Sequence, residues 1–260
     1  MRNTYAIFKR ELRSYFVSPI GYVVITAFLI MAGWFFFSIF ASMVKEAQIA
    51  DIRIRKFGED AVPLDVPYSI MKQFFDSLSS MLLFIIPIIT MGLLAEEKKR
   101  GTMELLLTSP ISDLQIILGK YFAALSFFIA MLLPTTAYFG LLLYYGDPEV
   151  PPAMAGYLGL LLLGAAQISL GLLVSAMAEN QIVSAFVSFG AISIFWFVDS
   201  AVNAMKSIWQ DFLQFFSFYI HFSDFSKGVV GLNDITFFLS FIALCVFLTH
   251  RAIESIRWRG

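Results

Sequence analysis

Six long apolar runs constrain this chain more than any other feature of its sequence. Each is close to or above the roughly 20 residues that cross the hydrocarbon core of a bilayer as a helix. Only 14% of the 260 residues are charged, against about 25% in an ordinary soluble domain. The sequence therefore predicts an all-α integral membrane protein with six transmembrane helices. They are expected at residues 19–43, 77–95, 119–145, 156–178, 182–202 and 233–250.

The basic residues predict how these spans are oriented. Six crossings place both termini on one side, and eleven of the 18 Lys and Arg residues then fall on that side. Basic residues next to spans favour the cytoplasm, so both termini should be cytoplasmic. The first apolar run has no cleavage site behind it and should remain as a membrane anchor.

The segment before the first span, residues 1–18, has the pattern of an amphipathic helix. Such a helix lies in the membrane interface, with its apolar face in the acyl boundary and its cations toward the headgroups. A basic flank that only orients the first span is the alternative. The residues concerned are Tyr5, Phe8, Leu12 and Tyr15 on the apolar side and Lys9, Arg10 and Arg13 on the basic side.

A polar insertion, residues 96–120, separates the second and third spans and is far longer than a chain reversal requires. The second span should continue into it as one helix, and Gly101 should end that helix. A two-turn helix is expected next, with Thr102 as its N-cap and Glu104 in its first turn, where the helix dipole favours an acid. Pro110 should terminate it, because the residue before a proline avoids the helical region.

This short helix has the character of a docking surface. Its three consecutive leucines, 105–107, cannot all face one way, so part of that apolar surface needs a partner. Ser112 and Gln115 then fit a capping box, and Ile111 with Ile116 fits a hydrophobic staple, which predicts that the third span begins before the membrane. The insertion is thus braced by a helix at each end. An amphipathic turn resting on lipid headgroups is the alternative.

The sequence contains no phosphate-binding loop. The motif G-x-x-x-x-G-K-[ST] needs a second glycine and a hydroxyl residue after the lysine. The only Gly-Lys pair, Gly119-Lys120, is followed by Tyr121, and position 114 is leucine. We therefore expect this chain to bind no ATP, Mg²⁺ or other cofactor itself, and any ATP hydrolysis to belong to another polypeptide. No basic cluster is long enough to indicate nucleic-acid binding.

Two segments on the expected outer side are more than simple loops. Residues 45–76 carry mixed charge and two prolines, and should be partly ordered. Residues 203–232 are crowded with aromatic side chains but interrupted by charges, which favours short re-entrant or interfacial helices over another span. Asp199 should lie near the outer interface, where it would cap or line an exit.

The insertion reads EEKKRGTMELLLTSPISDLQIILGK and resembles the cytoplasmic loop of ABC-2 type ABC-transporter permeases. The layout of the whole chain is similar to that family, and the opening FKRELRSYFVSPIGYV is most similar to gliding-motility-associated (GldF-like) permeases. The resemblance implies an elbow helix at residues 1–18, a coupling helix in the insertion that seats in a separate ATPase, and re-entrant helices at 203–232 that close the pathway outside.

The resemblance also implies roles for individual residues. The residues that it implies are Glu97, Arg100, Gly101, Thr102, Glu104, Leu105, Leu106, Pro110 and Glu179 for coupling to the ATPase; Phe8, Lys9, Arg10, Leu12 and Arg13 for the elbow helix; and Asp199, Trp209, Phe215 and Phe216 for an external gate.

The partners follow from the same resemblance. Two copies of an ABC ATPase, which binds ATP and Mg²⁺, and a second permease chain, identical or different, would complete an exporter of the bacterial inner membrane. Membrane lipid surrounds it. The segment 45–76 is longer than the family pattern requires, so an external auxiliary protein is a further expected partner.

Three other functions compete with this interpretation. A secondary transporter or channel would place ionisable groups deep in its helices, where this chain is almost bare. An intramembrane serine protease would need a serine and a histidine facing each other in the membrane, and the two histidines lie elsewhere. A membrane scaffold without transport activity would dock a partner through the same insertion.

Overall fold

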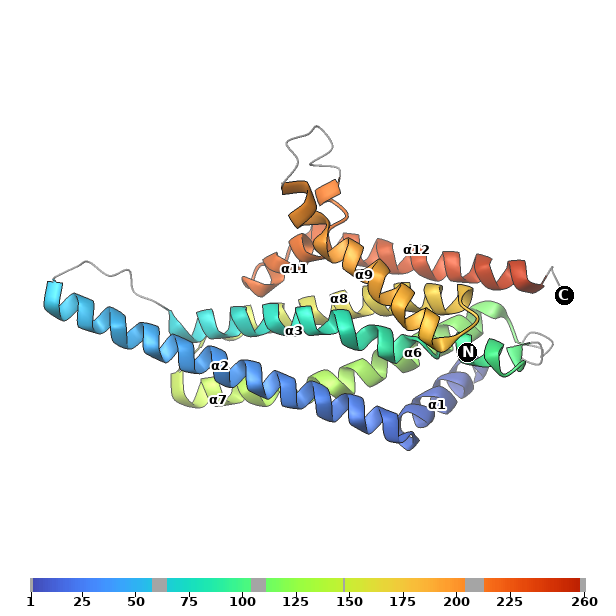
Figure 1. Ribbon diagram of the computed structural model, residues 1–260, viewed down its shortest axis with the longest axis horizontal. Coiled ribbons are helices and arrows are strands. Elements are labelled where there is room, and N and C mark those ends of the chain that lie inside the picture. Colours follow the sequence, from blue (N-terminus) through green and yellow to red (C-terminus); the bar gives the residue numbers. More distant parts are fainter. Residues whose placement is uncertain (1, 58–64, 104–110, 147, 204–212, 258–260) are drawn as a thin grey trace.

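The computed structural model describes residues 2–57, 65–103, 111–146, 148–203 and 213–257, and within these ranges it contains helices and no strand (Figure 1). In chain order the helices are α1 (Arg2–Val17), α2 (Pro19–Phe57), α3 (Val66–Thr90), α4 (Ala95–Lys99), α6 (Asp113–Leu132), the 3₁₀ turn η1 (Leu133–Thr135), α7 (Thr136–Gly146), α8 (Val150–Met177), α9 (Gln181–Asn203), α11 (Phe218–Ser226) and α12 (Leu232–Arg257).

Six stretches of the described chain are long and apolar enough to cross a membrane, which confirms the predicted fold class. The third of them is interrupted at Pro134, where η1 separates α6 from α7. The six stretches are Pro19–Ile52, Val66–Lys99, Asp113–Gly146, Val150–Met177, Gln181–Asp199 and Leu232–Ser255.

The first two spans extend further than the sequence predicts. Instead of a separate outer segment at 45–76, α2 continues to Phe57 and α3 already begins at Val66. Asp65 starts α3 by accepting a hydrogen bond from the Tyr68 amide at 3.1 Å, as an N-cap residue does. Figure 1 shows the free end of α2 reaching beyond the rest of the bundle.

Helix α8 is the centre of the bundle and packs against α3, α6, α9, α11 and α12. Its glycines make this possible, because a Cβ atom at four of them would lie only 2.1 to 2.4 Å from a neighbouring side chain. Small residues allow this close approach between membrane helices. The pairs are Gly156 with Phe75, Gly159 with Phe225, Gly164 with Phe128 and Gly171 with Thr90.

The two ends of the bundle differ in what they carry. Both termini lie at the same end as α4 and the turn between α8 and α9, which we call the termini end (Figure 1). The start of α3 and the tip of α2 lie toward the opposite end, which we call the far end.

Substitution of Gly171 by alanine tests the close packing of α8. The added Cβ would lie 2.2 Å from Thr90 Oγ1, so Gly171→Ala should destabilise the protein by about 1–3 kcal/mol, the usual cost of overpacking. Gly140→Ala is the matched control, because nothing lies within 4 Å of a Cβ at Gly140. Thermal unfolding of the purified chain in detergent measures both. Equal unfolding midpoints for the two variants would contradict the packing described here.

Candidate functional site at the termini end

Helix α1 is docked on the protein rather than lying free in the interface. Ile7 is buried against α6, where a Cβ at Gly119 would lie 2.8 Å from Ile7 Cγ2. The Tyr15 hydroxyl donates to the Ile89 carbonyl of α3 at 2.8 Å, and its ring stacks on Phe127 at 4.7 Å. The face that the sequence assigned to the acyl boundary therefore faces the bundle along most of its length.

The exposure of the other residues of the predicted elbow follows from this docking. Phe8 and Leu12 are half-buried against the protein, whereas Lys9 and Arg13 are exposed, as expected for the basic side. Tyr5 is the exception on the apolar side, because it is 64% exposed.

Four charged side chains meet where α1, α4 and α6 converge, and we call them the four-charge cluster. Lys120 of α6 places its Nζ 3.2 Å from Glu11 Oε1 and 3.0 Å from Glu97 Oε1. Arg10 places its Nη2 2.7 Å from Glu11 Oε1 and 3.3 Å from Glu97 Oε1. Two cations thus face two carboxylates from three separate segments.

The cluster is held together by the burial of Lys120. The Lys120 side chain is only 2% exposed, and a buried ammonium group is costly unless carboxylates compensate it. Burial alone would raise the pKa of Glu11, but the charges of Lys120 and Arg10 outweigh this and hold the pKa below its ordinary value. Removing one partner leaves a buried charge uncompensated, so the four residues depend on one another.

A break in the second span separates α3 from α4. The sequence predicts one continuous helix through Arg100, but α3 ends at Thr90 and residues 91–94 form a turn. Ser175 of α8 stabilises this turn, since its Oγ accepts from the amides of Leu94 at 3.0 Å and Ala95 at 3.1 Å. These amides begin a new helix and have no partner within it.

α4 is also hydrogen-bonded to α8, and its C-terminus is formed as the sequence predicts. Lys98 Nζ donates to the Ala176 carbonyl at the end of α8. Gly101 has a φ of 68° and ends α4. The Gly101 amide bonds the Lys98 carbonyl and the Thr102 amide bonds the Glu97 carbonyl, each at 3.0 Å, which is the Schellman pattern.

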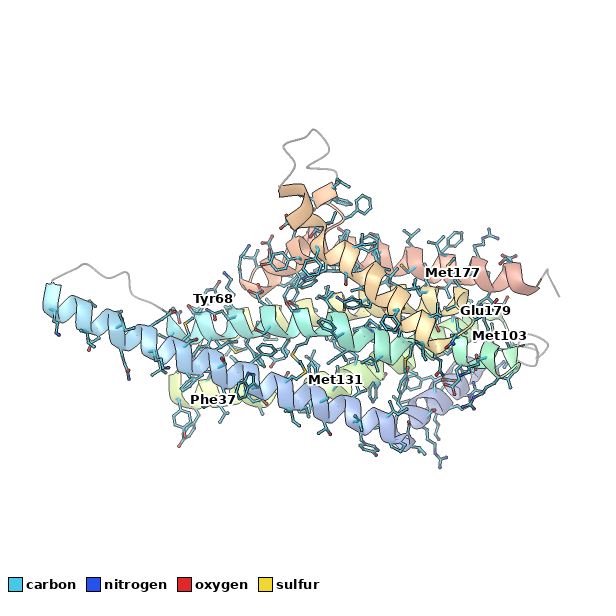
Figure 2. The ribbon with its side chains drawn as sticks, viewed as in Figure 1. Phe37, Tyr68, Met103, Met131, Met177 and Glu179 are labelled. Carbon is cyan, nitrogen blue, oxygen red and sulfur yellow. The ribbon has the colours of Figure 1, made fainter. Side chains whose placement is uncertain are left out.

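The residues predicted to contact an ATPase divide into two groups. Glu97, Arg100, Gly101 and Thr102 lie on or directly after α4, and Arg100 forms an exposed ion pair with Glu96. Glu179 lies exposed in the turn between α8 and α9, and Figure 2 shows it at the same end of the bundle as Met103. The remaining predicted contacts, Glu104, Leu105, Leu106 and Pro110, lie outside the described residues.

The start of the third span agrees only in part with its predicted cap. α6 begins at Asp113, with Ser112 in the N-cap position, as the capping pattern predicts. The Ser112 side chain, however, makes no capping hydrogen bond. The backbone carbonyl of Ser112 instead accepts a hydrogen bond from the Gln115 amide at 2.9 Å.

Toward the far end, α11 packs into the bundle through its aromatic side chains. Phe218, Phe222 and Phe225 are fully buried. His221 lies on the same helix, and its Nδ1 is 2.7 Å from Asp234 Oδ1. Its Nε2 donates a hydrogen bond to the Phe215 carbonyl at 3.0 Å. Its ring stacks on Phe237 of α12 at 4.0 Å. The segment before α11 is therefore tied to the beginning of α12.

The predicted external gate is only partly described. Phe215 and Phe216 are neighbours with ring centroids 5.8 Å apart, and Phe215 also contacts the His221 ring. Asp199 lies near the end of α9. Trp209 lies outside the described residues, so the structure brings together two of these four residues.

A family model described as an ABC-2 family transporter protein matches residues 5–252, nearly the whole chain. The chain belongs to the ABC-2 family of transporter proteins. This ABC-2 chain is accordingly a multi-pass permease subunit of an ABC transporter and not the ATPase, and its family implies an ABC ATPase as partner and lipid as surroundings. A comparison with curated protein sequences finds no match.

Sequence reasoning missed four residues that organise the two ends of this ABC-2 chain. Glu11 and Lys120 complete the four-charge cluster, Ser175 stabilises the turn at residues 91–94, and His221 anchors α11. A signal for Lys120 exists, since it is a charged residue at the edge of an apolar run, and such residues usually have a carboxylate partner. Nothing in the sequence identifies that partner as Glu11, because the two residues meet only when α1 folds back onto α6.

Glu11→Gln tests the electrostatics of the cluster through its pH dependence. At pH 7 the variant should be less stable than the parent chain by about 1.5–3 kcal/mol, the usual contribution of a hydrogen bond to a charged group. The pKa of Glu11 is lowered in the folded state, so its contribution is present above the ordinary value of 4.5 and is lost as the pH falls through the lowered value. The difference in unfolding midpoint should therefore shrink below about pH 4.5.

Glu254→Gln is the matched control for this measurement. Glu254 forms an exposed pair with Arg251 at 2.9 Å, and exposed pairs contribute about 0–1 kcal/mol. A Glu11→Gln effect no larger than that of Glu254→Gln, or one that is unchanged by acid, would contradict the compensation of Lys120 by Glu11.

Proposed function

We propose that this ABC-2 permease subunit couples to its ATPase through residues 101–110 of the insertion, and that the four-charge cluster transmits the movement into the membrane. The burial of Lys120 between Glu11 and Glu97 is the observation that carries the proposal. Through it α4 and α6, which precede and follow residues 101–110 in the chain, are both joined to α1. A displacement of the insertion therefore acts on three helices together.

The break at residues 91–94 gives this movement a place to occur. α3 is packed against α8 along its length, whereas α4 is a single short helix fastened by Ser175 and Lys98. α4 can therefore change its angle without repacking α3. The exposed Glu179 lies beside this hinge, which suits its proposed role as a second, smaller contact with the ATPase.

The wider assembly is proposed from the family and from the sequence. Two ATPase copies and a second permease chain, identical or different, would complete an exporter of the bacterial inner membrane with both termini in the cytoplasm. The likeness of the opening segment to gliding-motility-associated permeases remains a prediction. So does an external auxiliary protein, for which the exposed end of α2 offers a surface.

The far end is proposed to close the pathway on the outside. α11 and the residues before it form a compact aromatic unit held by His221, Asp234 and Phe237. The Tyr68 hydroxyl of α3 also donates to the Lys227 carbonyl at the end of α11, at 3.1 Å. Tilting of α3, to which α1 is hydrogen-bonded through Tyr15 and Ile89, would act on this unit directly.

Two variants separate docking from transmission. Leu106→Asp should abolish recovery of the neighbouring ATPase in a pull-down, because a carboxylate replaces an apolar contact. Lys120→Met should keep that recovery but lose the response to nucleotide at the far end. The response is the rate of maleimide labelling at Phe216→Cys, with and without ATP, in a Cys245→Ser background. This background has no other cysteine, since Cys245 is the only one in the chain.

Glu254→Gln again serves as the control and should behave like the parent chain in both assays. Retention of the ATPase by Leu106→Asp would show that the insertion is not the docking surface. A parental labelling response in Lys120→Met would remove the cluster as the coupling element. Recovery of the ATPase with no nucleotide response in the parent chain would instead favour a scaffold.

A further inference from the structure

A cavity of about 390 Å³ lies between the corner formed by α1 and α2 and the hinge of the second span. Sites for small ligands usually measure about 300–1,000 Å³, so the space suits a molecular group rather than a single water. Residues of α1, the first turns of α2, the end of α3, the hinge and α4 form its walls, and Phe127 of α6 closes one side. Glu11 of the four-charge cluster and the hinge residues also line this cavity, so it borders the proposed coupling elements.

The walls of the cavity change from apolar to charged along its length. Val24, Ile88 and Phe127 line the part formed by the membrane spans. Glu96 and Arg100 line the part formed by α4, outside the apolar portion of the second span. An amphiphile at a membrane interface has the same gradient, with acyl chains beside apolar side chains and a polar group beside charged ones.

The charges at the rim are suited to a headgroup that carries both signs. Arg100 and Glu96 are paired with each other, but their side chains remain 69% and 39% exposed. An exposed pair of this kind contributes little, so its members can exchange partners at small cost. A phosphate diester would pair with the guanidinium of Arg100, and an ammonium group would pair with the carboxylate of Glu96. One ion pair is thus replaced by two.

We propose that this cavity binds one membrane phospholipid with a primary ammonium and a phosphate diester in its headgroup, as in phosphatidylethanolamine. The phosphate lies at Arg100, the ammonium lies at Glu96, and an acyl chain runs past Val24 and Ile88. Gln181, at the beginning of α9, adds an uncharged polar group to the same rim. The bound lipid fills the space between the elbow helix and the hinge.

Gly92 lies in the cavity wall and provides a position from which a larger side chain can fill the cavity. A Cβ at Gly92 would lie 3.3 Å from Glu96 Oε2 and 3.5 Å from Gln181 Nε2, both at the ends of flexible side chains. Gly92→Leu therefore directs its side chain into the rim. Ile88→Trp fills the apolar part from a position that is already 42% exposed. Gly140→Leu is the matched control, since a Cβ there meets nothing within 4 Å.

Native mass spectrometry of the purified full chain measures the binding. The chain is titrated with phosphatidylethanolamine, phosphatidylcholine and phosphatidylglycerol that carry identical acyl chains. Phosphatidylcholine cannot donate hydrogen bonds from its ammonium group, and phosphatidylglycerol has no ammonium group. One molecule of phosphatidylethanolamine should bind about tenfold more tightly than either, the equivalent of one charge-assisted hydrogen bond. Gly92→Leu and Ile88→Trp should remove this preference, and Gly140→Leu should keep it.

Four results would overturn the proposal. Equal retention of the three lipids would show that the annulus around the protein is being measured. An undiminished preference in both cavity-filling variants would place the lipid elsewhere. Competition by soluble glycerophosphoethanolamine as strong as that by the lipid would identify a site for a free phosphate ester. A shift of the chain to dimers that excludes phosphatidylethanolamine would assign the cavity to a second copy instead.

Discussion

The charge of a single buried lysine determines how the termini end of this protein is assembled. Lys120 lies at the beginning of the third span, where neither water nor its own helix can compensate an ammonium group. Glu11 of α1 and Glu97 of α4 supply the compensating charge. This requirement keeps α1 folded against α6 and keeps α4 beside both, so the three helices form one unit.

The rest of the bundle is organised by shape rather than charge. Three of the four glycines of α8 face aromatic side chains of three different helices, and the fourth faces Thr90, so these contacts leave little freedom around it. α2 and α9 are the least buried of the spans. α8 therefore holds α4 by a few hydrogen bonds, at Ser175 and Ala176, and holds α3, α6 and α11 by close packing.

The sequence was sufficient for the spans, for the end of α4 at Gly101 and for the basic side of α1, because these depend on local pattern. It was insufficient for the break after Thr90, which needs the hydroxyl of Ser175 from a helix far along the chain. It also misplaced the apolar face of α1, because lipid and protein interior attract the same side chains. Glu11 and Ser175 are ordinary residues in the sequence, and only the return of distant helices gives them partners.

The length of α2 has a mechanical consequence. Its 39 residues form one helix from Pro19 to Phe57, which corresponds to about 58 Å, nearly twice the roughly 30 Å of the hydrocarbon core. Because the helix is so long, each degree of tilt about Pro19 moves Phe57 by about 1 Å. Adjustments at the elbow that are too small to repack a helix would thus become displacements on the other side of the membrane that another molecule could sense.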